Sequence, residues 1–110
     1  MLRYALVASL MITAAYAETV DVKYRGPIDL KHFVCKDTVS SFVNRVCYDE
    51  QNQYMLVLLK QAYYHYCEMP KAVLTSFLAA ESLGRFYNAN IKGTGKDGPY
   101  DCRTHKFPIY

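Results

Sequence analysis

Histidine and cysteine are the residue types in this chain whose spacing could indicate a zinc site. His65 and Cys67 are two positions apart, and Cys102 and His105 are three apart, which is within the spacing of ligand pairs in structural zinc sites. Such pairs usually lie on turns, whereas His65 and Cys67 fall in a stretch that alternates like a β-strand. We therefore expect no metal and no other cofactor, and disulfide bonds in place of a metal site.

The cysteines number four, an even count that favours two disulfides in an oxidising compartment. They are Cys35, Cys47, Cys67 and Cys102. We favour Cys47 with Cys67 and Cys35 with Cys102, because the strands that carry Cys47 and Cys67 finish at the same end of the expected sheet. A central strand separates these two by roughly 9–10 Å, whereas a disulfide needs Cα atoms about 5.5–6 Å apart. All three pairings therefore stay open.

Tyrosine is abundant, with eleven residues and no tryptophan. In AYYHYCEMP, residues 62 to 70, Tyr64 and Tyr66 point to one side of a strand, and Tyr63, His65 and Cys67 point to the other. Exposed aromatic rings on a sheet can stack on nucleobases or sugar rings. The alternative is that Tyr64 and Tyr66 pack under a helix as part of the core.

Polar candidates for a ligand site lie in GRFYNAN, residues 84 to 90, where Arg85 and Asn88 are interleaved with aromatic residues. The alternative role for asparagine here is a hydrogen bond to its own backbone in a turn. We take Tyr64, Tyr66, Arg85 and Asn88 as the ligand-binding candidates.

Histidines could also supply the acid and base of a small hydrolase or nuclease. Nothing in the spacing of His32, His65 and His105 puts two of them on one element, and the sequence contains no Gly-x-Ser-x-Gly, His-Glu-x-x-His or phosphate-binding glycine loop. We therefore expect no catalytic activity and no catalytic residue.

The first seventeen residues, MLRYALVASLMITAAYA, have the layout of a cleavable export signal, with Arg3 ahead of an apolar stretch and Ala15-Tyr16-Ala17 before Glu18. The apolar stretch is about twelve residues long, and a membrane span needs roughly twenty. We expect export to the periplasm or the medium, with no membrane attachment after cleavage. Without Arg3 the formal charge is close to +2, too small to indicate nucleic acid or a membrane surface as the partner.

The residue pattern after the leader predicts an α+β fold. We expect an extended arm over 18–38, strands over 39–48, 54–59 and 62–69, and a helix that starts at Pro70 and ends at Gly84. The uninterrupted apolar sequence of 54–59, YMLVLL, predicts that this strand is central, covered on both faces or paired on both edges. A second short helix follows over 85–91, and 93–110 is a tail. The predicted architecture is a three-stranded antiparallel β-meander packed against one main helix, with extended N- and C-terminal arms.

Several segments in this order resemble the KTSC domain, a family named after the C-terminus of some lysyl-tRNA synthetases. They are SSFVNRVCYD (40–49), YMLVLL (54–59), the tyrosine pair in YHY (64–66) and the Pro70 helix ending in AAESLGRFYNANI (79–91). The resemblance covers 39–92. It implies RNA binding through the synthetase context and no assigned activity beyond that. The chain departs from the pattern in its leader, in Cys47 where glycine is expected, and in the Lys60-Gln61 turn.

These observations together predict an exported, disulfide-stabilised binding or interaction module of KTSC type, whose ligand is an unknown small molecule or protein. The alternatives are RNA binding through Tyr64 and Tyr66, and a small secreted hydrolase or nuclease that uses a histidine. The sequence leaves the oligomeric state open.

Overall fold

The structure is a computed structural model that describes residues 18–92 and 98–110. The predicted leader, 1–17, and the first part of the predicted tail, 93–97, lie outside the described residues. Within the described part no helix is long and apolar enough to cross a membrane.

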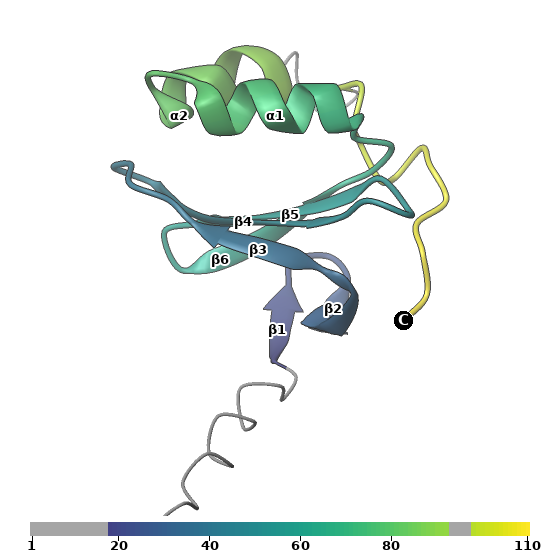
Figure 1. Ribbon diagram of the computed structural model, residues 1–110. Helices are drawn as coiled ribbons and strands as arrows, with labels where there is room; N and C mark the ends of the chain where they lie inside the picture. The colour runs from purple at the N-terminus through teal and green to yellow at the C-terminus, as the bar shows by residue number, and fades with distance from the viewer. Residues whose placement is uncertain (1–17, 93–97) are drawn as a thin grey trace, which may run out of the picture.

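Six strands form one sheet (Figure 1). They are β1 (Thr19–Val22), β2 (Gly26–Asp29), β3 (Val34–Asp37), β4 (Val43–Asp49), β5 (Tyr54–Leu59) and β6 (Ala62–Tyr66). Their order across the sheet is β2-β1-β6-β5-β4-β3. All neighbours are antiparallel except β1 and β6, which are parallel and pair at Val22 and Tyr63.

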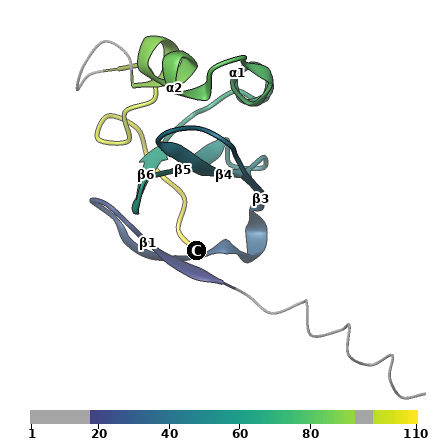
Figure 2. The ribbon, with the colours of Figure 1, turned by 90° about the vertical axis from the view of Figure 1, so that its left-hand side faces the viewer.

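The sheet curls so that β1 and β2 lie beneath β4–β6, on the side opposite the helices (Figure 2). A short 3₁₀ turn, Leu30–His32, leads from β2 into β3 at the other edge. The curl creates a second core inside its concave face, where Val20, Val22 and Ile28 pack with Tyr54 and Leu56.

Strand β5 is buried on both faces, which explains its uninterrupted apolar sequence YMLVLL. Met55 and Val57 face the helices, and Tyr54 and Leu56 face the inside of the curl. All four side chains are fully buried. The expected central position of this segment is therefore confirmed. The sheet nevertheless contains more strands than the sequence predicted.

Three helical segments cover the convex face: α1 (Lys71–Ala79), α2 (Leu83–Phe86) and the π-helical η3 (Tyr87–Ile91). Pro70 precedes α1, where its missing N–H costs nothing. Gly84 does not end α1, as the sequence suggested. It lies inside α2, where a Cβ atom would come within 2.6 Å of Cε1 of Phe42, so the residue is needed for close packing of α2 on the entry to β4.

The predicted fold, a three-stranded meander packed against one main helix, is wrong. The arm 18–38 is not merely extended but contributes three of the six strands, and the helical layer consists of short segments. Strands of four residues give too few positions for a clear alternating pattern, and their pairing with β6 and β4 is decided by residues distant in the sequence.

The two disulfides join Cys35 to Cys47 and Cys67 to Cys102. The prediction that all four cysteines are oxidised is thus confirmed, whereas the favoured pairing of Cys47 with Cys67 and Cys35 with Cys102 is wrong. Cys35 and Cys47 lie directly opposite each other on neighbouring strands β3 and β4, so β3, which was not predicted, supplies the nearer partner. Both sulfur bridges belong to the core inside the curl.

Candidate ligand-binding site

Five tyrosines line a hollow of about 450 Å³ at the open edge of β6. We call it the tyrosine hollow and define it by Tyr24, Tyr64, Tyr66, Tyr87 and Tyr100. These side chains come from the β1–β2 turn, strand β6, the helical segment η3 and the C-terminal tail. An aromatic concavity with a few polar groups is the usual form of a small-molecule site.

Tyr64 and Tyr66 share one face of β6, as the alternation of the strand requires. Tyr66 packs against the core under the helices, and its hydroxyl is hydrogen-bonded to that of Tyr87. Burial raises the pKa of both phenols, and for Tyr66 the nearby Tyr87 hydroxyl adds to this effect. The pair therefore stays neutral and forms a rigid inner wall.

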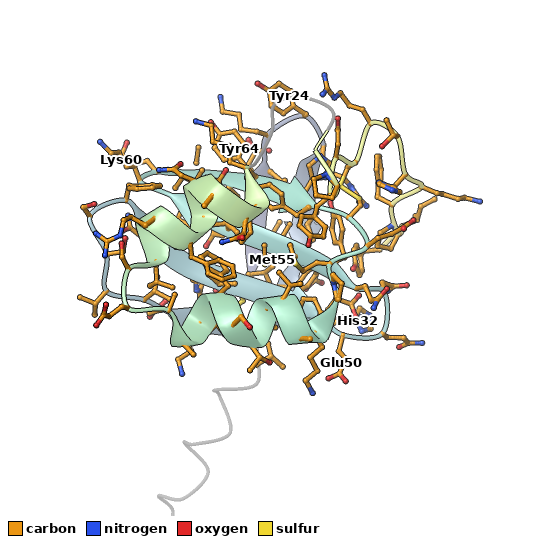
Figure 3. The ribbon with its side chains drawn as sticks, turned by 90° about the horizontal axis from the view of Figure 1, so that it is seen from above. Tyr24, His32, Glu50, Met55, Lys60 and Tyr64 are labelled. Carbon is orange, nitrogen blue, oxygen red and sulfur yellow. A yellow bond between two sulfur atoms is a disulfide. The ribbon has the colours of Figure 1, made fainter. Side chains whose placement is uncertain are left out.

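Tyr24 stands at the mouth of the hollow, beside Tyr64 (Figure 3). The two ring centroids are 6.5 Å apart, with the planes tilted by 51°. Tyr24 has a positive φ of 69° in the β1–β2 turn, and its side chain is 89% exposed. Together Tyr24 and Tyr64 offer an aromatic surface on which a ring-shaped ligand can lie.

Charged groups also line the hollow. Nη2 of Arg103 donates to Oδ2 of Asp101 at 2.6 Å, and the backbone N–H of Arg103 also donates to the Asp101 carboxylate at 2.9 Å. The hydrogen bonds from Arg103 lower the pKa of Asp101 to about 2, so this carboxylate remains ionised at neutral pH. Lys92 adds a second cation at the rim.

The edge of β6 contributes backbone groups. Lys23 N–H donates to Tyr63 C=O, and Cys67 N–H donates to Tyr100 C=O, both at 2.9 Å. Groups of alternate residues point to the same edge in an antiparallel strand, so His65 between them turns its N–H and C=O outward. In residues 18–92 and 98–110 neither group has a backbone partner. The tyrosine hollow therefore presents one amide donor and one acceptor beside its rings.

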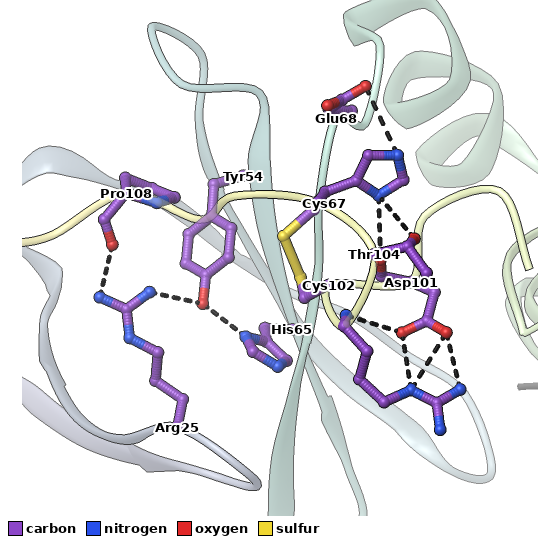
Figure 4. Close-up of a disulfide and its surroundings, with 11 residues drawn as sticks. Arg25, Tyr54, His65, Cys67, Glu68, Asp101, Cys102, Thr104 and Pro108 are labelled. Atoms are coloured by element: carbon purple, nitrogen blue, oxygen red, sulfur yellow. Dashed lines mark hydrogen bonds and ion pairs between the residues drawn. A yellow bond between two sulfur atoms is a disulfide. The ribbon is translucent and has the colours of Figure 1, made fainter. Parts of the chain in front are cut away.

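Behind the hollow, Arg25, Tyr54 and His65 form a hydrogen-bonded chain next to the Cys67–Cys102 disulfide (Figure 4). Nη1 of Arg25 donates to the Tyr54 hydroxyl at 3.1 Å, and this hydroxyl donates to Nδ1 of His65 at 2.7 Å. Burial, and then the charge on Arg25, lower the pKa of His65. Nη2 of Arg25 donates to Pro108 C=O at 2.6 Å. The hydrogen bonds of Arg25 therefore attach the C-terminal tail to the inside of the curl.

The other histidines lie in different surroundings. Nε2 of His105 is 3.7 Å from Oε1 of Glu68, and its Nδ1 is 2.9 Å from the Asp101 carbonyl oxygen. His32 stacks on the ring of Tyr110. Across the described residues no group of three or more His, Cys, Asp or Glu side chains could hold a metal ion.

The predicted site residues separate into two places. Tyr64 and Tyr66 line the tyrosine hollow, whereas Arg85 and Asn88 line another hollow of about 330 Å³, beside residues 39–42 at the start of β4. No residue lines both. Ser82, whose Oγ accepts from Arg85 N–H at 3.2 Å, explains the local sequence as a helix start.

Sequence reasoning missed Tyr24, Tyr87 and Tyr100 as parts of the hollow. Tyr24 stands in a segment that was taken for an arm, and Tyr100 is two residues before Cys102. The correct disulfide was the signal that could have found Tyr100, because the bond to Cys67 holds this part of the tail beside Tyr66.

Comparison with known proteins gives one family and one solved relative. The KTSC domain family matches residues 39–94. The crystal structure of a KTSC domain protein from Yersinia pestis is similar, with 28% sequence identity and a TM-score of 0.53 over 56% of this chain and 89% of that chain. A search of curated proteins found no match.

The family match leaves out segments at both ends of the described domain. Strands β1–β3 precede it and residues 98–110 follow it. Each disulfide joins one cysteine inside the matched segment, Cys47 or Cys67, to one outside it, Cys35 or Cys102. Tyr24 and Tyr100 also lie outside the matched segment.

Proposed function

The chain belongs to the KTSC domain family. From the geometry of its tyrosine hollow and its disulfides we propose that it is an exported, non-catalytic binding module that takes a sugar ring in this hollow. The observation that carries the proposal is the presence of aromatic and polar groups in one concavity: the rings of Tyr24 and Tyr64 line the same hollow as Asp101 and Arg103. Aromatic faces suit the apolar side of a sugar, and fixed donors and acceptors suit its hydroxyls.

The charge of the hollow favours a sugar over a nucleic acid. Arg103 is balanced by Asp101 at 2.6 Å, and the chain as a whole carries a formal charge of only +3. Binding a phosphate backbone depends on several cations that neutralise successive phosphates. The RNA proposal implied by the family therefore finds less support here than stacking of a neutral ring.

Two features support export. The four cysteines are all oxidised, which is typical of proteins outside the reducing cytosol. The seventeen residues before Glu18 have the order of charge, apolar stretch and small residues found in export signals. Periplasm and external medium both meet the redox requirement.

We infer the absence of catalysis from the hydrogen bonding and the lowered pKa of His65. Nδ1 of His65 accepts from the buried Tyr54 hydroxyl, and its depressed pKa keeps the ring neutral. An imidazole held in this way supports the tail and is poorly placed to exchange protons with a ligand.

The test is a titration of the mature protein, residues 18–110, with glucose-based and N-acetylglucosamine-based oligosaccharides. Binding is measured by calorimetry and by the NMR chemical shifts of the backbone amides. We expect shifts centred on Tyr24, Tyr64 and Tyr100. Tyr24→Ala should weaken binding about tenfold, equal to about 1.4 kcal/mol, because a stacked ring contributes roughly 1–3 kcal/mol. Tyr24→Phe should bind almost as well as the parent.

Val39→Ala is the matched control, since Val39 is 98% exposed and lines a different hollow. A single-stranded RNA oligonucleotide serves as the second ligand. Preferential retention of RNA, or release of reducing ends from the oligosaccharides, would contradict the proposal.

A further inference from the structure

A second and larger groove, of about 740 Å³, runs between helix α1 and the outer strand β3. Val46 and Tyr48 of β4 form its floor, and Leu74 and Leu78, one helical turn apart, form the wall on α1. On the opposite side stands Val34, whose side chain is 80% exposed. The groove shares no lining residue with the tyrosine hollow.

Strand β3 is the last in the sheet, and its outer edge has no neighbour among the described strands. Thr38 N–H donates to Asn44 C=O, so the alternate β4 residues Asn44, Val46 and Tyr48 turn their backbone groups toward β3. Their partners Val34 and Lys36 turn theirs back toward β4. The N–H and C=O groups of Cys35 and Asp37 consequently point outward and form an open edge.

A disulfide fixes this edge. Cys35 is bonded to Cys47 directly opposite it on β4. A strand held covalently to its neighbour loses less freedom when another chain pairs with it, which lowers the entropic cost of binding.

The side chains beside the open edge indicate which kind of peptide strand could bind there. Val34 and Lys36 share the face toward α1, because they are two residues apart in a strand. Lys36 has no ion-pair partner in the part of the chain that the structure describes. An added strand could place two apolar side chains over Val34, Val46 and Leu74. The next side chain on the same face of that strand would then lie beside the Lys36 ammonium.

We propose that the β3–α1 groove binds an extended peptide segment of a partner protein, which adds to β3 as a seventh strand. The segment carries alternate apolar side chains that enter the groove and an acidic side chain that pairs with Lys36. Main-chain hydrogen bonds to Cys35 and Asp37 hold the segment beside β3, and the groove determines which side chains of the segment fit. The proposal stands independently of the tyrosine hollow.

The test uses the mature protein, residues 18–110, with its disulfides intact, and the synthetic peptide acetyl-SVSVSES-amide, in which both valines and the glutamate fall on one face. Backbone amide shifts should move in β3, β4 and α1. The peptide acetyl-SVVSSSE-amide has the same composition without the alternation and should bind at least tenfold more weakly.

Two variants at Asp37 separate strand addition from other contacts. Asp37→Pro removes an outward N–H and leaves the β3–β4 pairing intact, and it should weaken peptide binding at least tenfold. Asp37→Ala keeps that N–H and loses only the ion pair to Nε of Arg45 at 3.2 Å, so it should bind like the parent. Far-UV circular dichroism of both variants establishes that the fold is retained.

Val34→Ser should also weaken binding, whereas Val39→Ser, on an exposed side chain outside the groove, should not. Three results would overturn the proposal: equal binding of the two peptides, equal binding by the Asp37→Pro and Asp37→Ala proteins, or failure of both peptides to bind. Concentration-dependent dimerisation that is abolished by Asp37→Pro would assign the edge to a second copy of this chain and equally overturn it.

Discussion

Single side chains in this protein take their roles from the strand face on which they lie. Tyr64 and His65 are neighbours in sequence, yet the half-buried Tyr64 lines the tyrosine hollow together with four other tyrosines, and His65 is hydrogen-bonded to the buried Tyr54 hydroxyl. At Asp49 hydrogen bonds outweigh the effect of burial on the pKa. Although burial opposes ionisation, hydrogen bonds from Tyr110 and Asn52 lower the pKa of this buried carboxyl.

His65 makes stability depend on pH in a defined direction. Its pKa is lowered in the folded protein, so below about pH 6.5 the unfolded chain binds a proton that the native state resists. The free energy of unfolding should therefore fall as the pH drops through and below about 6.5, by about 1.4 kcal/mol for each unit between the two pKa values.

Urea unfolding at pH 8, 6.5 and 5 measures this effect. His65→Asn keeps an acceptor near the position of Nδ1 and cannot titrate, so its urea midpoint should change less between pH 6.5 and 5. Asp49 affects stability only near and below its ordinary pKa of 3.8 and does not enter this window. Equal pH dependence in parent and variant would refute the assignment.

Among the secondary-structure elements, the short segments carry the most specific packing. Helix α2 has four residues, begins with Ser82 as its cap, and places Gly84 against the ring of Phe42. That ring in turn packs edge-on against Tyr87, with centroids 6.1 Å apart, so it has little room to move. The contact links the helical layer to the start of β4.

Gly84→Ala should lower the free energy of unfolding, even though alanine favours a helix by about 1 kcal/mol over glycine. The added Cβ would meet Cε1 of Phe42 at 2.6 Å, and overpacking of this kind costs roughly 1–3 kcal/mol. Thermal unfolding measures the change. In a Phe42→Leu background the same substitution should cost less, and an equal cost in both backgrounds would rule out the clash as its cause.

Strands β1–β3 show why elements of the arm were missed. Val20 and Val22 alternate with exposed residues, but two positions are too few to distinguish a strand from an extended arm. Val22 becomes part of the sheet through Tyr63, forty-one positions later in the sequence. Only the folded chain brings those residues together.

For the molecule as a whole, the disulfides attach flanking segments to the part that matches the family. Cys35 brings in β3, and Cys102 brings in the tail that closes the tyrosine hollow. The Cys67–Cys102 bond is buried in the core inside the curl, and the half-buried Cys35 packs against that core through its bond to the buried Cys47, so both bonds also hold the second core closed.

The pairing can be read directly from a tryptic digest of the non-reduced protein, because each cysteine falls in a different peptide. Residues 32–36 should be linked to 46–60, and 61–71 to 97–103. Mass spectrometry before and after reduction identifies both pairs. Any link between 46–60 and 61–71 would show that the connectivity is different.

Removal of the two bonds should have unequal effects. The Cys67–Cys102 bond closes a loop of 35 residues and the Cys35–Cys47 bond one of 12. Chain entropy predicts losses of about 4 and about 3 kcal/mol respectively. Urea unfolding of the Cys67→Ser/Cys102→Ser and Cys35→Ser/Cys47→Ser proteins measures the two losses, and the reverse order would contradict the entropic account.

The proposed export predicts the N-terminus of the protein recovered from its natural host. Its first residue should be Glu18, because cleavage after Ala17 leaves the whole described domain in place. Glu18 is already tied to the domain by its carboxylate, 3.0 Å from Nη1 of Arg45, and by its C=O, which accepts from Leu30 N–H at 2.7 Å. Mass spectrometry of the intact protein checks the terminus, and an uncleaved Met1 form would count against export.

The sequence by itself determined the family, the oxidised state of the cysteines and the buried central strand 54–59, because these depend on local pattern and composition. Alternation also correctly separated Tyr64 and Tyr66 from His65. The tertiary structure alone decided the six-stranded curl, the partner of each cysteine and the gathering of Tyr24, Tyr87 and Tyr100 around β6. These depend on contacts between residues far apart in sequence, whose free energy no local pattern contains.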